Sequence, residues 1–201
     1  MDEHELIWAA QAGDISAFNP LVLKYQDLIY RQAYYLLKDD ENAQDLTQDV
    51  FIKAFQKLDT FRGGSFKAWL LRMVTNAAYD ELRRYKRYPL IPLNPANDDD
   101  VEIESPGWLT DPGFSPEEIA EQNDFRRALQ RCLDKLQPNY RSAVILVDLQ
   151  ELDYEAASEV LGIPMGTLKS RLSRARLYLR DSLHVFYAGD EQKFSRQARY
   201  V

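Results

Sequence analysis

Six of the nine prolines in this 201-residue chain fall between positions 89 and 116, and this cluster constrains the fold more than any other feature. Proline fixes the backbone dihedral φ and removes a hydrogen-bond donor, so a segment this rich in proline does not form a regular helix or a sheet. Residues 89–124 also carry ten acidic side chains and no basic one, and repulsion between like charges extends a chain. We therefore interpret residues 89–115 as an acidic, largely extended linker between two domains, at residues 1–88 and 116–186.

Both predicted domains show helical periodicity, and neither shows convincing strand alternation. In the first domain, the stretch "SFKAWLLRMVTNAAYDELRRYKRY" repeats its apolar residues at the spacing of one helix face. Gly13 and Asp14 predict a stop and an N-cap before a helix over residues 15–37, in which Pro20 predicts a kink or a break. A further helix is expected over about residues 42–58, ahead of the Gly63-Gly64 pair. The fold class is all-α, with four helices in this domain.

The second domain predicts a helix-turn-helix at its end. Ser115, Pro116 and Glu118 have the pattern of a helix start, with a capping box and proline at the first position. That helix is expected to reach about residue 136, where Gln137-Pro138 breaks it, and "NYRSAVILVDLQ" predicts the next helix. A short helix over residues 154–161, the tight connection "GIP" and a longer helix from about residue 165 complete the domain. Residues 187–201 form a tail with little to bury.

The last predicted helix carries an unusual concentration of positive charge. From Met165 to Arg180 there are five basic residues and no acidic one, although the whole chain has a formal charge of −7. A solvated helix would normally intersperse acids for pairing, whereas the second helix of a helix-turn-helix enters the DNA major groove. The inward face comprises Ala157, Leu161, Ile163, Leu168, Leu172 and Ala175. The outward face comprises Lys169, Ser170, Ser173 and Arg174, with Arg171, Arg176 and Arg180 to the sides, suited to phosphates.

The residue spacing alone suggests two further helix faces as candidate binding surfaces. In the basic zone of residues 50–88, one helix face combines cations, an amide and an aromatic ring, a composition suited to single-stranded nucleic acid; it reads Arg72, Thr75, Asn76, Tyr79 and Arg83. The helix before it places Asp45, Gln48, Asp49, Ile52 and Gln56 on the side opposite Leu46, Val50, Ala54 and Leu58. That face fits either a protein contact or ordinary surface, because single exposed apolar residues are normal.

The stretches "DLTQDVFIKAFQKLDTFRGGSFKAWLLRMVTNAAYDELRR" and "LDYEAASEVLGIPMGTLKSRLSRARLYLR", in this order, resemble a bacterial RNA polymerase sigma factor of the extracytoplasmic-function type, in the sigma-70 family. The resemblance covers nearly all of residues 4–186 and implies a factor that directs core polymerase to promoters. It implies core RNA polymerase, through its beta and beta-prime subunits, as a partner, and contacts to the clamp helices of the largest subunit by Asp45, Leu46, Gln48, Asp49 and Ile52. It implies −10 element contacts by Phe61, Arg62, Gly63, Gly64, Ser65, Arg72 and Asn76, to which the helix spacing adds Tyr79 and Arg83. It implies −35 element contacts by Thr167, Lys169, Ser170, Arg171, Ser173, Arg174 and Arg176.

The resemblance further implies an anti-sigma partner and a linker that threads through the polymerase cleft. The family often has an acid or asparagine where Gly64 stands, so the base preference of this loop is open. The alternative function is a helix-turn-helix regulator that recruits polymerase without replacing its initiation factor, although residues 1–88 lack the strand pattern of a receiver domain.

An enzyme is not expected, because the sequence has no phosphate-binding loop, metal cluster or nucleophile constellation. We expect no cofactor and no metal. The single cysteine, Cys132, excludes an internal disulfide. The acidic N-terminus does not resemble a signal peptide, and no apolar run is long enough for a membrane span, so a soluble, cytoplasmic protein is expected.

Overall fold

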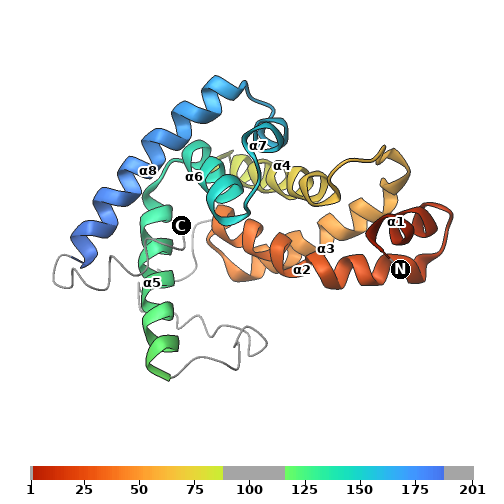
Figure 1. Cartoon of the computed structure of the whole chain (residues 1–201), viewed down its shortest axis with the longest axis horizontal. Coiled ribbons are helices and arrows are strands. Elements are labelled where there is room, and N and C mark those ends of the chain that lie inside the picture. The colour runs from red at the N-terminus through yellow and green to blue at the C-terminus, as the bar shows by residue number, and fades with distance from the viewer. Residues whose placement is uncertain (1, 88–115, 188–201) are drawn as a thin grey trace.

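The computed structural model describes residues 2–87 and 116–187, and every regular element in these two ranges is helical (Figure 1). The predicted linker and tail, and the predicted N-cap Ser115, lie outside the described residues. The N-terminal segment contains the helices α1 (Glu3–Gln11), α2 (Ile15–Leu37), α3 (Asp40–Gln56) and α4 (Phe66–Arg87), with a 3-10 turn, η1 (Leu58–Thr60). The C-terminal segment contains α5 (Pro116–Lys135), α6 (Pro138–Val144), the π-helical turn η3 (Ile145–Leu149), α7 (Tyr154–Leu161) and α8 (Met165–Tyr187).

Aspartate caps set four of the helix starts. Asp2 forms a capping box with Glu5 at the start of α1, and the side chains of Asp14, Asp39 and Asp153 accept hydrogen bonds from backbone amides at the starts of α2, α3 and α7. Such caps satisfy amides that have no partner inside the helix. Helix α3 therefore begins two residues earlier than the apolar pattern predicts.

Helix α2 runs unbroken through Pro20, so of the kink or break expected there the break does not occur. The proline lies in the second turn of the helix, where its missing amide removes a single bond to the carbonyl four residues earlier. Its neighbours Phe18 and Leu21 are buried, and their packing holds the chain in the helical path. The single helix expected over "NYRSAVILVDLQ" also differs, because α6 passes into the wider turn η3 after Val144.

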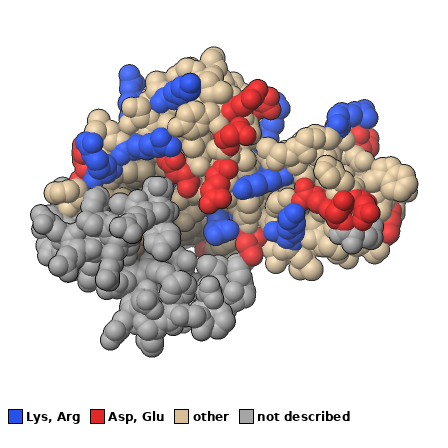
Figure 2. All heavy atoms as spheres, in the orientation of Figure 1, with Lys and Arg blue, Asp and Glu red and all other residues tan. Residues whose placement is uncertain are grey.

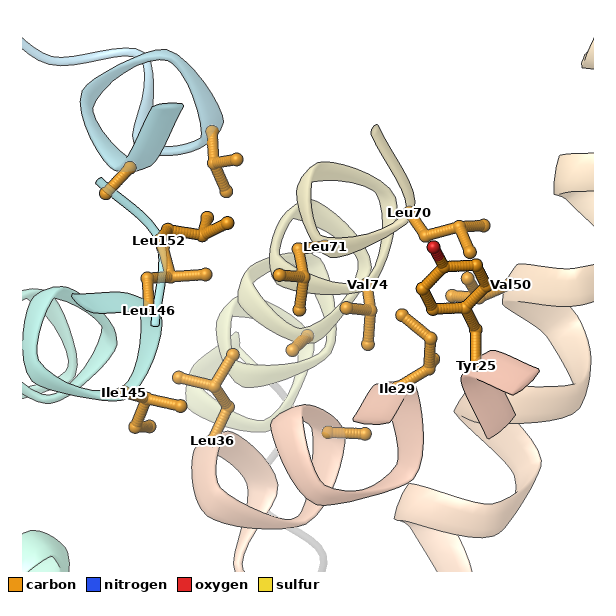
Figure 3. Close-up of a cluster of buried hydrophobic side chains, with 14 of the residues drawn as sticks. Tyr25, Ile29, Leu36, Val50, Leu70, Leu71, Val74, Ile145, Leu146 and Leu152 are labelled. Carbon is orange, nitrogen blue, oxygen red and sulfur yellow. The ribbon is translucent and has the colours of Figure 1, made fainter. Parts of the chain in front are cut away.

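The core of the N-terminal segment lies between α2, α3 and α4. Phe66, Leu70 and Val74 of the predicted apolar stripe of α4 are buried, and Leu71 and Ala78 are buried with them. Trp69, Met73 and Ala77, which the periodicity also places on the stripe, are half-buried. In the C-terminal segment, α8 packs on α5, α6 and α7. The two segments are in direct contact: α4 packs against α7, and the end of α2 against α5 and α6. One continuous set of buried apolar side chains joins them, including Leu36, Leu71 and Ile145 (Figure 3).

Candidate nucleic-acid interface

The outward side of α3 is polar apart from Ile52 and the partly exposed ring of Phe55. Asp45, Gln48, Asp49 and Ile52 are exposed, and Ile52 keeps 55% of its surface in water. They recur three and four residues apart and so share one side of the helix. Neither aspartate has an ion-pair partner within residues 2–87 and 116–187. Leu46, expected from the resemblance to share this surface, instead lies in the core at 9% exposure, so it can position the face but offers it little contact area.

The loop before α4 is fixed at its two ends and open in its middle. Phe61 is buried, with its ring 5.4 Å from that of Phe66 and 5.5 Å from that of Trp69. Gln11 Nε2 donates to the carbonyls of Leu58, at 2.8 Å, and Phe61, at 3.0 Å, which ties α1 to the loop.

Beyond Phe61 the loop is exposed from Arg62 to Ser65. Gly63 and Gly64 have φ values of 101° and 88°, in the left-handed region where glycine is favoured. No atom lies within 4 Å of a Cβ built at either position. Ser65 Oγ accepts a 3.1 Å bond from the amide of Ala68, in the first turn of α4. The chain therefore presents two exposed glycine peptides between the buried Phe61 and the first turn of α4.

Helix α4 exposes only part of its predicted polar face. Arg72 and Asn76 are exposed one turn apart, and Arg83 is exposed beside its partner Asp80, at 2.5 Å. Thr75 is buried, and its hydroxyl accepts a 3.1 Å bond from Gln32 Nε2. Thr75 is therefore a packing residue, contrary to its assignment to the exposed face.

Tyr79 is half-buried against the C-terminal segment. Its hydroxyl lies 3.1 Å from the carbonyl oxygen of Pro138 and 2.6 Å from Ser142 Oγ. The sequence places Tyr79 on the same face as Arg72 and Asn76. In the structure α6 covers part of Tyr79, so it is less exposed than these two residues.

Helix α8 has the inward and outward faces that its spacing predicts. Leu168, Leu172 and Ala175 are buried against Ala157 and its neighbours, while Leu161 and Ile163 are half-buried. Gly162 adopts the left-handed conformation, with φ of 62°, that ends α7 and turns the chain toward α8. Lys169, Ser170, Ser173 and Arg174 are all exposed on the opposite side, and Thr167 and Arg171 are half-buried. Figure 2 shows lysine and arginine side chains gathered over the part of the molecule where Figure 1 places α8.

Two arginines on α8 have partners that the sequence pattern did not identify. Arg174 Nη1 donates a 3.3 Å bond to the hydroxyl of Tyr140. Arg176 forms a two-pronged ion pair with Asp148, at 2.5 and 3.0 Å, and a longer bond to Tyr154. The hydrogen bonds with Asp148 raise the pKa of the Arg176 guanidinium. We expected Arg176 to be free for phosphate contact, but Asp148 already neutralises it, because η3 brings this carboxylate to the side of α8.

Residues 2–87 and 116–187 contain no group of three or more histidine, cysteine, aspartate or glutamate side chains placed to hold a metal ion. No helix in the described part of the chain is long and apolar enough to cross a membrane.

The chain matches two family models, Sigma-70 region 2 over residues 21–88 and Sigma-70 region 4 over residues 126–179. It is 37% identical over 174 residues to ECF RNA polymerase sigma factor SigE of Mycolicibacterium smegmatis, covering 85% of this chain and 64% of that relative, so it spans less than two thirds of that protein. It is 31% identical to ECF RNA polymerase sigma factor SigW of Bacillus subtilis, covering 91% of it. It is 33% identical to the ECF RNA polymerase sigma-E factor of Escherichia coli, also covering 91%.

Two solved structures are similar over most of the chain. One is the sigma factor RpoE in complex with the anti-sigma factor NepR from Bartonella quintana, with a TM-score of 0.64, 29% identity, and coverage of 85% of this chain and 99% of that one. The other is CnrH in complex with the cytosolic domain of CnrY, with a TM-score of 0.62 and coverage of 90% of this chain and 96% of that one. At 23% identity the second similarity bears on the fold alone.

Proposed function

This protein belongs to the extracytoplasmic-function group of the sigma-70 family, whose members bind core RNA polymerase and direct it to promoters, and we propose how its described surfaces divide that task. The outward side of α3, with Asp45, Gln48, Asp49 and Ile52, binds core polymerase. The loop over residues 61–65 and the exposed part of α4 engage the −10 element as the duplex opens. The outward face of α8 reads the −35 element in the major groove.

The exposed face of α8 is the observation that carries this proposal. Lys169, Ser170, Ser173 and Arg174 lie together in solvent on a helix whose opposite side is buried against α5, α6 and α7. Cations and hydroxyl groups on the second helix of a helix-turn-helix can contact base edges and flanking phosphates. Arg180 is exposed further along the helix, and within residues 2–87 and 116–187 its one ion pair is with the adjacent, equally exposed Asp181. An exposed pair suits a phosphate contact better than the pair of Arg176 with the mostly buried Asp148.

Two features of the proposed −10 surface support its assignment: a packed helix carries its side chains, and the loop beside that helix is open. Arg72 and Asn76 project from a helix whose other side is buried, so their positions are fixed before DNA binds. The glycine peptides of residues 63 and 64 provide exposed amides with no side chain in the way. A base displaced from the duplex could be held there by backbone contacts and by Arg62.

The partners in this proposal are core polymerase, promoter DNA and an anti-sigma factor, in the cytoplasm. The anti-sigma partner rests on the RpoE–NepR complex, which has the same fold over 85% of this chain. The protein supplies specificity, and polymerase performs the chemistry.

Run-off transcription with purified core polymerase tests the proposal. A sigma factor yields promoter-specific transcripts when it is added alone to core enzyme. A helix-turn-helix regulator, the alternative function, would yield them only when another sigma factor is also present. Mapping the 5′ ends of the transcripts then locates the −10 and −35 elements.

A further inference from the structure

Helix α1 lies beside the loop that the proposed −10 surface uses. It packs on α2 and on η1, the turn that leads from α3 into residues 61–65. Figure 1 shows α1 next to the connection between α3 and α4. The match to Sigma-70 region 2 begins at residue 21, so α1 lies outside the part of the chain that this family model covers.

The side chain of Gln11, the last residue of α1, joins this helix to the loop. Its Nε2 donates to the carbonyl of Leu58, at 2.8 Å, and to the carbonyl of Phe61, at 3.0 Å. A glutamine amide nitrogen carries two hydrogens, so both are used. The orientation of the amide is also determined, because the two carbonyl oxygens can only accept and the nitrogen must therefore face them.

The bond to Phe61 fixes the peptide group from which the exposed loop starts. In the part of the chain that the structure describes, Gln11 is the one hydrogen-bond donor to the Phe61 carbonyl. This carbonyl belongs to the planar peptide group that contains the amide of Arg62. Holding its oxygen therefore sets the direction in which the chain leaves toward Arg62. The Phe61 ring is held separately, because it is buried against Phe66 and Trp69.

The two glycines of the loop cannot fix its path themselves. Gly63 and Gly64 have no side chain, and no atom lies within 4 Å of a Cβ built at either position. Glycine has more backbone freedom to lose than any other residue, so a loop with two adjacent glycines depends on its ends for a defined path. Ser65 provides one end through its bond to an amide in the first turn of α4, and Gln11 provides the other.

Helix α1 is itself held firmly enough to act as a support. The carboxylate of Glu3 accepts hydrogen bonds from Lys24 Nζ and from the Tyr25 hydroxyl on α2, both at 2.5 Å. Two apolar residues of α1, Ile7 and Ala10, are buried at 5% exposure each. A helix of nine residues is marginal when isolated in water, so these contacts keep α1 folded and its last residue in place.

We propose that α1 supports the loop over residues 61–65 and that Gln11 is a positioning residue, which presets this loop for one base of the −10 element and so sharpens the choice of that base. The inference rests on the proposed function for its ligand, single-stranded −10 DNA, but the contact between Gln11 and the loop does not. A preset loop loses less conformational freedom when a base binds. A loose loop can adapt to several bases, as flexible binding surfaces do.

Three variants of the full chain test the role of Gln11. Gln11→Glu keeps the shape of the side chain but replaces both donor hydrogens with an acceptor oxygen, which the two carbonyls repel. Gln11→Lys keeps a hydrogen-bond donor at the end of a long side chain. Gln26→Glu makes the same charge change at an exposed position of α2 and is the matched control.

Base discrimination in the presence of core polymerase is the functional readout. Promoters that differ by one base at each −10 position compete for open-complex formation. We expect Gln11→Glu to lose about tenfold of the preference at one −10 position, with the −35 preferences and polymerase binding unchanged. Gln11→Lys and the control should keep the preference of the parent protein. A merely structural role would weaken all promoters alike, so a uniform loss would overturn the proposal, and so would an unchanged preference.

The ¹⁵N relaxation of the Gly63 and Gly64 amides in the free full chain tests the contact itself. We expect order parameters of roughly 0.85, typical of a rigid backbone, in the parent protein, in Gln11→Lys and in the control. In Gln11→Glu they should fall below about 0.6, the range of a flexible backbone. Equal order parameters in the parent protein and in Gln11→Glu would show that α1 does not support the loop.

The inference and the proposed function fail in different ways. If the parent protein with core polymerase shows no −10 preference, the proposed function is wrong and the base-selecting role of Gln11 is wrong with it, even where the glycines loosen in Gln11→Glu. If the parent protein shows the preference and Gln11→Glu retains it, the proposed function stands and the inference alone is wrong.

Discussion

The carboxylate of Asp148 on η3 binds the guanidinium of Arg176 on α8 through two hydrogen bonds, from Nη2 to Oδ1 at 2.5 Å and from Nε to Oδ2 at 3.0 Å. The side chain of Asp148 is only 11% exposed. The pair therefore fixes the outer side of the proposed −35 helix to the turn that precedes α7. Arg176 is a positioning residue in this geometry, because its charge is already satisfied within the protein.

Asp148→Asn is expected to destabilise the protein by about 1–2 kcal/mol, because it removes the charge of a mostly buried partner and leaves Arg176 with a weaker acceptor. Urea unfolding followed by circular dichroism measures this change in the free energy of unfolding. The control is Asp181→Asn, whose pair with Arg180 is exposed at both ends and should contribute nothing measurable. Equal effects from the two substitutions would show that the Asp148–Arg176 pair does not hold α8 in place.

Leu46→Ala is expected to lower stability, whereas the double substitution Gln48→Ala with Asp49→Ala is expected to lower polymerase binding. Leu46 is buried, so its truncation should cost about 2–4 kcal/mol of stability through lost packing. The double substitution, at two exposed positions, should leave stability nearly unchanged and weaken binding to core polymerase. Pull-down with core enzyme and thermal unfolding separate the two effects. Undiminished polymerase binding by the double variant would remove α3 from the proposed interface.

Gly64→Ala is expected to cost about 1 kcal/mol, because its φ of 88° is unfavourable for a residue with a Cβ although the surrounding space is open. Gly64→Asn should cost less, since asparagine tolerates the left-handed region better than alanine. Unfolding free energies measure the difference. If alanine were tolerated as well as asparagine, the loop would not need the left-handed conformation at this position.

Arg174→Ala and Arg180→Ala are expected to weaken DNA binding in different ways. Arg174 lies on the outward face, so its loss should cost roughly 1–3 kcal/mol at one or two −35 positions and leave the others unchanged. Arg180 lies further along α8, so its loss should weaken all sequences about equally and reduce the salt slope by about one unit. Binding of the full chain to a library of −35 duplexes at two salt concentrations distinguishes them. A uniform loss for Arg174→Ala would mean that the reading face is rotated from the one assigned here.

The helices and their buried faces could be predicted because burial imposes a period of about 3.6 residues on the sequence. Leu70, Val74, Leu168 and Leu172 all follow that period, and all are buried. The exposure of Lys169, Ser170, Ser173 and Arg174 follows from the same pattern. Their roles in binding, like those of the α3 and α4 faces, stay predictions.

The contacts between distant segments could not be predicted in this way. Arg141 lies in α6 between Tyr140 and Ser142, and its charge suggests solvent exposure, but the ends of α2 and α5 bury it together. Asp148 and Arg176 are 28 positions apart, and no local period relates them. Both interactions depend on how whole helices pack, and Thr75 and Tyr79 lose exposure for the same reason. The signal in the sequence was that Arg141 is the single basic residue of α6 and η3 and stands just before the apolar run of residues 143–147.

Permanganate reactivity of thymines in the −10 element is the most direct test of the central claim, that this chain opens promoters with α4 as an initiation factor. We predict reactive thymines when core polymerase and this protein are both present and no other sigma factor is added. The double variant Arg72→Ala with Asn76→Ala should lose this reactivity while it still binds core polymerase. Thymines that react only after another sigma factor is added, or that react equally with the double variant, would contradict the account.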